Sequence, residues 1–386
     1  SDLYVKDTSD LGDLESKFRS FGWEVARCDC HDFNALHKVF TDFKKNKDRP
    51  QILIADTKKG KGVSFMEKFG DDGFYKFHSG APNPENYSLA FKELLDEINV
   101  NLKKAGLKSL KFKSVPAKII TVLKNPERLI PAYGDELVKI SEENKKIVVL
   151  NSDLLLDCGL IPFKKKFPGR FIECGIAEQD MVSAAGGLAL RNKLPIAHSF
   201  ACFLSTRPNE QIYNNATENT KIIYTAALAG ILPAMPGHSH QSVRDISAVG
   251  GIPNLIMIQP SCEKETRMAL RWAVEKNKKS SYLRLVSIAC EKSFELPENY
   301  KLEIGRGIVL KSGKDAALIA YGPLMLGEAV KAARLLDKKG ISLAVINIPW
   351  LNKIDEKWIL KELHEYGTIF TVDDNYTNMC QGALIA

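Results

Sequence analysis

No apolar run in this 386-residue sequence reaches the roughly eighteen residues that a membrane-spanning helix needs. No secretory signal peptide is recognisable, and the eight cysteines follow no regular spacing, which argues against a framework of disulfides. We therefore expect reduced thiols, a cytoplasmic location and no contact with a membrane.

The sequence also lacks a basic stripe interleaved with aromatic residues, the pattern typical of nucleic-acid binding. Its net charge of +7 comes from short lysine-rich segments such as Lys164 to Lys166, which are typical of solvated surfaces. We expect no nucleic-acid partner. Since 45% of the residues are apolar and 26% are charged, the composition predicts a globular protein of two or three domains.

Complete metal-ligand clusters are missing as well. Cys28, Cys30 and His31 lie close together, but a tetrahedral zinc site needs four ligands and no second pair follows at a suitable spacing. His238 and His240 lie two residues apart, again with no carboxylate or cysteine spaced to join them. The sequence therefore predicts no metal ligands among its own residues.

The stretch from Arg170 to Leu190 is the most informative part of the sequence. It predicts a strand, a turn and then an apolar helix, and Glu178 stands at the start of that helix, where the helix dipole favours a carboxylate. The helix contains the small residues Ala184 to Gly187, which permit close approach of another backbone. A glutamate at a helix start is usually only a cap, so position alone leaves its role open.

A second motif follows about twenty residues after Glu178. Phe200 and Phe203 lie three apart, on one side of a helical turn, and Arg207 follows. Two aromatic residues at this spacing are normally core residues. Together with Gly175 to Met181, however, they resemble the pyrimidine-binding domain of transketolases. The resemblance implies that Glu178 hydrogen-bonds a ring nitrogen of the aminopyrimidine of thiamine diphosphate, and that Phe200 and Phe203 stack on that ring.

The chemistry of this cofactor explains the residue types. Thiamine catalysis begins with the loss of a proton from a very weakly acidic ring carbon, and the exocyclic amine of the cofactor is the base. A proton on the opposite ring nitrogen drives that amine toward its imino form. A carboxyl group between aromatic rings holds a proton more readily than one in water. The resemblance therefore implies that Glu178 is catalytic and relays a proton.

The resemblance extends to other positions. Asp153 and Leu154 match a Ser-Ala-Asp-Leu segment beside the cofactor, although Asp after a strand is also common turn chemistry. His78 matches a His-Gly-x-Pro segment near the cofactor diphosphate and the donor substrate, although a lone His before a turn is most often structural. His240 matches a histidine that contacts the donor sugar. These matches imply cofactor contacts for Asp153, Leu154 and His78, and catalytic roles for His78 and His240.

Strands alternate with helices along the whole chain, which predicts an α/β protein of parallel sheets covered by helices. The resemblance implies the thiamine diphosphate-binding fold in three domains. Residues 1–115 would be the C-terminal part of a diphosphate-binding domain with a linker, residues 125–295 the pyrimidine-binding domain, and residues 303–386 a truncated transketolase C-terminal domain. The family's Mg²⁺ motif, a Gly-Asp-Gly followed by an Asn, is expected before residue 1. We therefore expect either a fragment or a partner chain that supplies the magnesium ligands.

Two hypotheses of different classes follow. The first is an enzyme of carbohydrate metabolism, a transferase that uses thiamine diphosphate and Mg²⁺ to move a two-carbon ketol unit from a ketose to an aldehyde. An acyloin-type carboligase such as deoxyxylulose-phosphate synthase is the alternative enzyme. The second hypothesis is a non-catalytic subunit or half of a split transketolase. The small residues Ala184 to Gly187, with the family's site between two chains, predict a homodimer.

Departures from the family pattern concern the substrate. The resemblance puts Ile130, Asp157 and Ser287 where transketolases carry the two arginines and the serine that grip a sugar phosphate. We therefore expect an unphosphorylated, nucleotide-linked or otherwise modified sugar, or a keto acid. Arg207 and Arg284 are the candidates for a phosphate anchor that has moved elsewhere.

Overall fold

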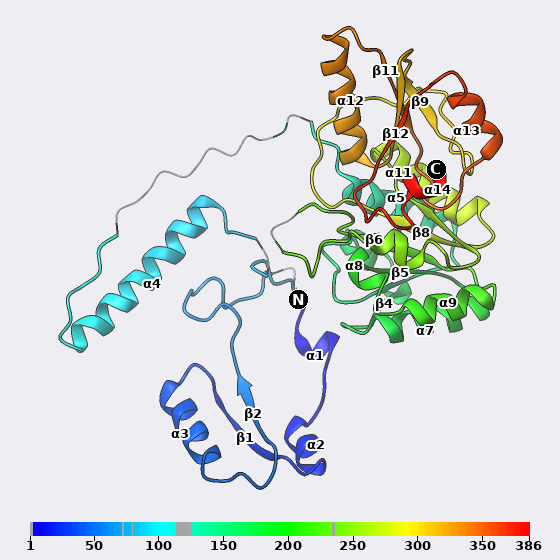
Figure 1. Ribbon diagram of the computed structural model, residues 1–386. Coiled ribbons are helices and arrows are strands. Elements are labelled where there is room, and N and C mark those ends of the chain that lie inside the picture. Colours follow the sequence, from blue (N-terminus) through cyan, green and yellow to red (C-terminus); the bar gives the residue numbers. More distant parts are fainter. Residues whose placement is uncertain (1–2, 72, 79, 113–122, 124, 234–235) are drawn as a thin grey trace. The chain divides into compact units, whose positions relative to one another are not determined.

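A computed structural model describes residues 3–71, 73–78, 80–112, 123, 125–233 and 236–386. The chain divides into two compact units, residues 1–119 and 120–386. Each of the three β-sheets contains parallel strands that alternate with helices along the chain (Figure 1). The predicted fold class, α/β with parallel sheets covered by helices, is therefore confirmed.

The first unit is built around a two-stranded parallel sheet. Its elements are α1 (Val5–Thr8), α2 (Leu14–Ser20), β1 (Glu24–Asp29), α3 (Phe33–Phe43), β2 (Gln51–Asp56) and α4 (Pro84–Lys104). Helices α2 and α3 bury no side chain within the described residues, and α4 buries only Ala90. Apolar side chains of α4 such as Tyr87 and Ile98 are exposed instead. This unit therefore has a very small core of its own.

The second unit begins with a six-stranded parallel sheet in the order β4-β3-β5-β6-β8-β7. Its elements are α5 (Leu129–Glu143), β3 (Ile147–Asn151), α6 (Ile161–Lys166), η1 (Pro168–Arg170), β4 (Phe171–Glu173), α7 (Glu178–Leu190), β5 (Leu194–Phe200), α8 (Ala201–Leu204), α9 (Asn209–Thr217), β6 (Ile223–Ala227), α10 (Asp245–Val249), β7 (Leu255–Ile258), α11 (Glu263–Arg271), η2 (Trp272–Lys276) and β8 (Ser280–Arg284). The central strands β3, β5 and β6 are buried along their whole length, as in sheets covered on both faces.

Helices cover both faces of this sheet. Successive strand residues point to opposite faces, and Ala197 and Tyr224 belong to the core cluster that includes side chains of α7 and α9. Their neighbours His198 and Thr225 contact Tyr133 of α5 instead. Helices α7 and α9 therefore lie on one face, while α5 and α11 pack together on the other (Figure 1).

A four-stranded sheet follows, in the order β12-β10-β11-β9, with β9 antiparallel to β11. Its elements are β9 (Ile308–Lys311), β10 (Ala316–Ala320), α12 (Pro323–Asp337), β11 (Leu343–Asn347), α13 (Glu356–Leu363), β12 (Ile369–Val372) and α14 (Gln381–Ile385). Leu326, Ala329 and Ala333 of α12 pack on β10 and β11. Among the residues described, no helix has both the length and the apolar character that crossing a membrane requires.

Arg284, the last residue of β8, joins the two sheets of the second unit. Its Nε donates to Asp245 Oδ2 at 2.8 Å, and its Nη1 donates to Asp374 Oδ1 at 2.6 Å and also to Gln259. Nη2 donates to the carbonyl of Ser242 at 2.8 Å. Arg284 is completely buried, so it cannot serve as the phosphate anchor that the sequence suggested.

A second buried polar group, the His198 ring, lies between the six-stranded sheet and α5. The His198 ring is completely buried, with Nε2 2.7 Å from Tyr133 Oη and Nδ1 3.1 Å from the carbonyl oxygen of Leu150. Since that carbonyl can only accept, Nδ1 carries the hydrogen and Nε2 accepts from Tyr133. Burial lowers the pKa of His198 to about 4, so this ring is neutral in the folded protein.

We expect the free energy of unfolding to fall as the pH is lowered from about 6.5 toward 4. In this window His198 is protonated in the unfolded chain but stays neutral in the folded protein. Lowering the pH therefore favours the unfolded state. A pKa lowered from 6.5 to about 4 corresponds to roughly 3 kcal/mol below pH 4. Chemical denaturation followed by tryptophan fluorescence at several pH values measures the effect.

His198→Gln keeps hydrogen-bonding groups at this position but cannot titrate, so it should remove this part of the pH dependence. His364, which is 66% exposed, provides the control variant His364→Gln. Equal pH slopes for the wild type and His198→Gln between pH 4 and 6.5 would show that the lowered pKa is wrong.

Candidate functional site

The carboxyl ends of the parallel strands β3 to β6 meet at one edge of the six-stranded sheet. Doubly wound α/β domains bind ligands at this edge. β4 ends at Glu173 and is followed by a short turn into α7, whose first residue is Glu178. β5 ends at Phe200 and runs directly into α8, which carries Phe203. The two strongest motifs of the sequence therefore meet at this edge.

Glu178 is a buried carboxylate, 3% exposed. Arg207 Nη1 donates to both of its oxygens, at 2.7 Å from Oε1 and 2.9 Å from Oε2, and Ser199 Oγ donates to Oε1 at 3.0 Å. A buried carboxylate is costly unless charge-assisted hydrogen bonds satisfy it. Arg207 supplies the positive charge while its own side chain stays 40% exposed. The sequence identified both residues but predicted neither this ion pair nor the contact with Ser199.

Three aromatic rings lie next to this ion pair. The centroids of Phe200 and Phe203 are 5.8 Å apart, with an angle of 39° between the rings. The His240 ring meets both at steep angles, 6.0 Å from Phe200 and 5.2 Å from Phe203. Arg207 Cζ lies 3.8 Å from the centre of the Phe203 ring. The structure thus brings Glu178, Phe200, Phe203 and His240 into one group around Arg207.

Glu173 hydrogen-bonds the backbone of two loops at this edge of the sheet. Sequence analysis did not identify this residue. Its Oε1 accepts the backbone N–H of Asp153 at 2.7 Å and of Gly175 at 3.1 Å, and its Oε2 accepts from Asn151 Nδ2 at 2.7 Å. Burial raises the pKa of the Glu173 carboxyl. Asp153, at φ +58°, adopts the left-handed conformation that Asp tolerates. Glu173 therefore holds Asp153 and Leu154 beside the loop that leads to α7.

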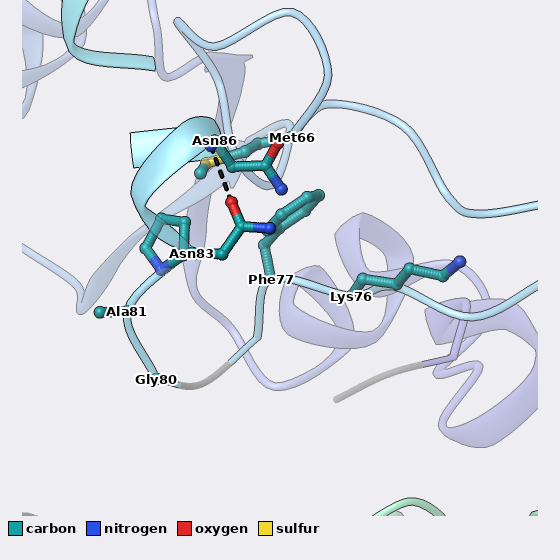
Figure 2. Close-up of a pocket in the computed structure, with 8 residues that line it drawn as sticks. Met66, Lys76, Phe77, Gly80, Ala81, Asn83 and Asn86 are labelled. Carbon is teal, nitrogen blue, oxygen red and sulfur yellow. Dashed lines mark hydrogen bonds between the residues drawn. The ribbon is translucent and has the colours of Figure 1, made fainter. Parts of the chain in front are cut away.

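His78 belongs to the first unit, whereas this edge belongs to the second. Its Nδ1 lies 2.7 Å from Lys59 Nζ. The chain just beyond it lines a cavity of about 420 Å³ at the start of α4. Figure 2 shows Asn83 and Asn86 in this cavity, with Phe77 beside them. The catalytic and cofactor roles of His78 stay predictions.

Two of the three positions that depart from the transketolase pattern, those of Ile130 and Ser287, make structural contacts. Ile130 is 8% exposed and packs closely against Gly159. Ser287 Oγ accepts the backbone N–H of Leu228 at 2.8 Å. Of the two arginines considered as relocated anchors, Arg284 is buried and Arg207 is 40% exposed.

The residues at this edge fit the aminopyrimidine ring of thiamine diphosphate in kind. Glu178 offers carboxylate oxygens to a ring nitrogen, and Phe200 and Phe203 offer faces on which an aromatic ring can stack. They do not fit a metal ion. In the part of the chain that the structure describes, no three His, Cys, Asp or Glu side chains are arranged to hold one.

A parallel sheet that gathers polar and aromatic side chains at its carboxyl edge defines a doubly wound α/β ligand-binding domain. Comparison with models of protein families shows which family these domains resemble. Residues 129–289 match the transketolase pyrimidine-binding domain, and residues 305–386 match the transketolase C-terminal domain.

Individual relatives agree. The chain is 35% identical over 246 residues to a protein of Methanocaldococcus jannaschii described as a transketolase C-terminal section, covering 63% of this chain and 76% of that protein. The chain thus belongs to the transketolase family. It is also 28% identical to 1-deoxy-D-xylulose-5-phosphate synthase of Clostridium botulinum, covering 91% of this chain and 50% of the relative, and 29% identical to transketolase-like protein 2 of Mus musculus, covering 94% and 58%. It therefore spans between 50% and 58% of the length of these longer relatives.

Solved structures show the same fold. A split-gene transketolase, described as an inactive β4 tetramer, matches with a TM-score of 0.61 at 31% identity, covering 68% of this chain and 84% of that one. A transketolase of Pichia stipitis matches with a TM-score of 0.58 at 17% identity, covering 98% of this chain and 64% of that one. At that lower identity the likeness extends to the fold alone.

We expect Arg207→Gln to lower the free energy of unfolding by about 1–3 kcal/mol, because it leaves the buried carboxylate of Glu178 without its positive partner. The value is below that of a fully buried pair, since Arg207 is 40% exposed and solvent screens it. Urea denaturation of the wild type, both single variants and the double variant Glu178→Gln/Arg207→Gln measures the coupling.

The double variant should recover part of the loss, because Glu178→Gln removes the charge that Arg207→Gln leaves unpaired. Arg191→Gln, which alters an exposed arginine just after α7, is the matched control. Strictly additive effects of the two substitutions would exclude an energetic coupling between Glu178 and Arg207.

Proposed function

We propose that this chain carries the pyrimidine-binding part of a thiamine diphosphate-dependent transferase, which moves a two-carbon ketol unit from a ketose donor to an aldehyde acceptor. The observation that carries this proposal is the buried carboxylate of Glu178 next to the rings of Phe200 and Phe203, at the carboxyl edge of the sheet. Membership of the transketolase family supports it. An acyloin-type carboligase is the second candidate, because the identity to a deoxyxylulose-phosphate synthase is similar to that with a transketolase-like protein.

The chain's own residues would act as follows. Glu178 would hydrogen-bond a ring nitrogen of the aminopyrimidine and exchange a proton there, while Arg207 and Ser199 orient its carboxylate. Phe200 and Phe203 would stack on the ring and exclude water. His240, whose Nδ1 lies 3.0 Å from Ser239 Oγ, would face the donor. Bound thiamine diphosphate supplies the carbanion chemistry that breaks a carbon–carbon bond beside a carbonyl.

Asp153 and Leu154 would contact the cofactor from the turn that Glu173 holds, and His78 would lie near the diphosphate. Mg²⁺ would be bound through residues outside this sequence. In the proposed division the diphosphate-binding part ends near residue 115, the pyrimidine-binding domain covers 125–295 and the C-terminal domain covers 303–386.

The rest of the diphosphate-binding domain would come from a further segment of the protein or from a partner chain. The first unit supports this, because it has one two-stranded sheet and helices that bury almost nothing among the described residues. The similarity to a split-gene transketolase also supports a partner chain. Helix α7 also exposes Ala184 and Gly187, which leaves room for a second copy of the chain, whereas Gly186 packs on Asn215. The assembly would therefore be a homodimer, or a complex of this chain with that partner.

We expect Glu178→Gln to slow the exchange of the cofactor's thiazolium C2 proton with deuterium by about 10²–10⁴-fold, the usual share of general acid–base catalysis, because an amide cannot relay a proton. Binding of thiamine diphosphate with Mg²⁺ should suffer less than the exchange rate. Calorimetry gives the binding constant and ¹H NMR gives the exchange rate, for this chain together with the polypeptide that completes its first unit.

Arg191→Gln is again the control and should exchange at the wild-type rate, since Arg191 lies on an exposed turn. Wild-type exchange in Glu178→Gln would show that the carboxylate is not the proton relay. A complex that binds no thiamine diphosphate would contradict the proposed function as a whole.

We expect xylulose 5-phosphate and ribose 5-phosphate to be poor substrates, because Ile130 and Ser287 are engaged in structural contacts. Losing two charge-assisted hydrogen bonds of about 1.5–3 kcal/mol each weakens a phosphate ester by roughly two to four powers of ten. The natural substrate would be an unphosphorylated, nucleotide-linked or otherwise modified sugar, or a keto acid. Steady-state kinetics test this: a kcat/KM near 10⁴ M⁻¹s⁻¹ or above for both sugar phosphates, on the usual scale of enzymes, contradicts it.

A further inference from the structure

A second cavity, of about 440 Å³, shares Phe203 and Arg207 with the candidate site. Its other walls come from the segment that leads into α10 and from Tyr376, which follows β12. His238 and Arg244 belong to that segment. The cavity thus lies where the pyrimidine-binding and C-terminal domains meet, within the second unit.

The lining of this cavity is positively charged. Its charged side chains are Arg207 and Arg244, and its described residues include no Asp or Glu. Glu178 pairs with Arg207, and Asp245, which follows Arg244 in the sequence, pairs with Arg284. No acidic side chain pairs with Arg244 anywhere in the described part of the chain. Arg244 therefore carries an uncompensated positive charge at the cavity.

Arg207 also has hydrogen-bond donors that no described residue accepts from. A guanidinium group offers five N–H donors on three nitrogens, and within the described residues only Nη1 of Arg207 is used, on Glu178. Nε and Nη2 remain available on a side chain that is 40% exposed. One arginine can therefore hold Glu178 with one nitrogen and a ligand in the cavity with the other two.

The backbone around Arg244 is fixed on both sides. The carbonyl of Ser242 accepts from Arg284 Nη2 at 2.8 Å, and the carbonyl of Val243 accepts from the backbone N–H of Tyr376 at 2.7 Å. Asp245, the next residue, is fully buried against Arg284. Buried contacts thus hold the flanking residues, while the Arg244 side chain itself is exposed. The backbone of Arg244 is therefore already ordered before a ligand binds, which lowers part of the ordering cost of binding.

We propose that this cavity binds an oxyanion of the substrate, a phosphate or a carboxylate, through Arg244 and the available nitrogens of Arg207. Planar guanidinium groups match the geometry of both oxyanions. The identity of the bound group as part of the substrate rests on the proposed function, whereas the affinity of the cavity for an oxyanion does not. A substrate held here is gripped by residues other than those at positions 130, 157 and 287.

The test is a titration of this chain with inorganic phosphate, and separately with acetate, at constant pH and ionic strength and without cofactor. The ¹H NMR resonance of the His238 ring reports on the cavity, and His238→Gln identifies it. We expect both anions to shift this resonance. Arg244→Gln should raise the dissociation constant of the preferred anion about ten- to one-hundredfold, the loss of one charge-assisted hydrogen bond. Arg244→Lys, which keeps the charge but not the fork of donors, should raise it less.

Arg191→Gln removes the same charge from an exposed turn and should leave the dissociation constant unchanged. Tighter phosphate binding indicates a nucleotide-linked sugar, and comparable or tighter acetate binding indicates a keto acid, so either supports the proposal. If neither anion shifts the His238 resonance, or if Arg244→Gln and Arg191→Gln bind equally well, the proposal is wrong. Because no cofactor is present, these outcomes are independent of the thiamine chemistry proposed above.

Discussion

The second unit depends on one buried guanidinium group. Arg284 comes from the end of β8, and its partners come from α10, from the residue after β7 and from the segment after β12. Buried ions are tolerated only when each is paired and hydrogen-bonded, so this arrangement forms only when both domains are docked in one register. The same contacts fix Ser242 and Asp245, and with them the chain that presents His240 and Arg244. The geometry of the candidate site is therefore a consequence of domain docking.

Local patterns in the sequence predicted much of this structure. The helix that starts at Glu178, the strand before it and the phenylalanine pair all follow from short-range periodicity and from the resemblance to transketolases. The contacts that complete the site do not follow from these local patterns. Arg207 lies 29 residues from Glu178, and Arg284 lies 90 residues from Asp374. Pairings over such distances depend on how strands are ordered in the sheet, which periodicity does not encode.

Glu173 and Arg284 show why the structural roles of charged residues at strand ends were not predicted from the sequence. Each is the last residue of a strand, where a charged side chain normally points to solvent. In this fold Arg284 is fully buried and Glu173 is partly buried, and both hydrogen-bond backbone atoms as well as side chains. Charge at the end of a covered strand is therefore a sign of loop positioning, which sequence analysis did not consider.

The thin sheet of the first unit has a consequence for how this protein exists in a cell. Within the described residues β1 and β2 pair only with each other, so each keeps one edge of unpaired backbone groups. Such edges are templates for pairing with any other strand, including those of identical chains. Unless another strand covers these edges, copies of the chain are expected to pair through them and to aggregate.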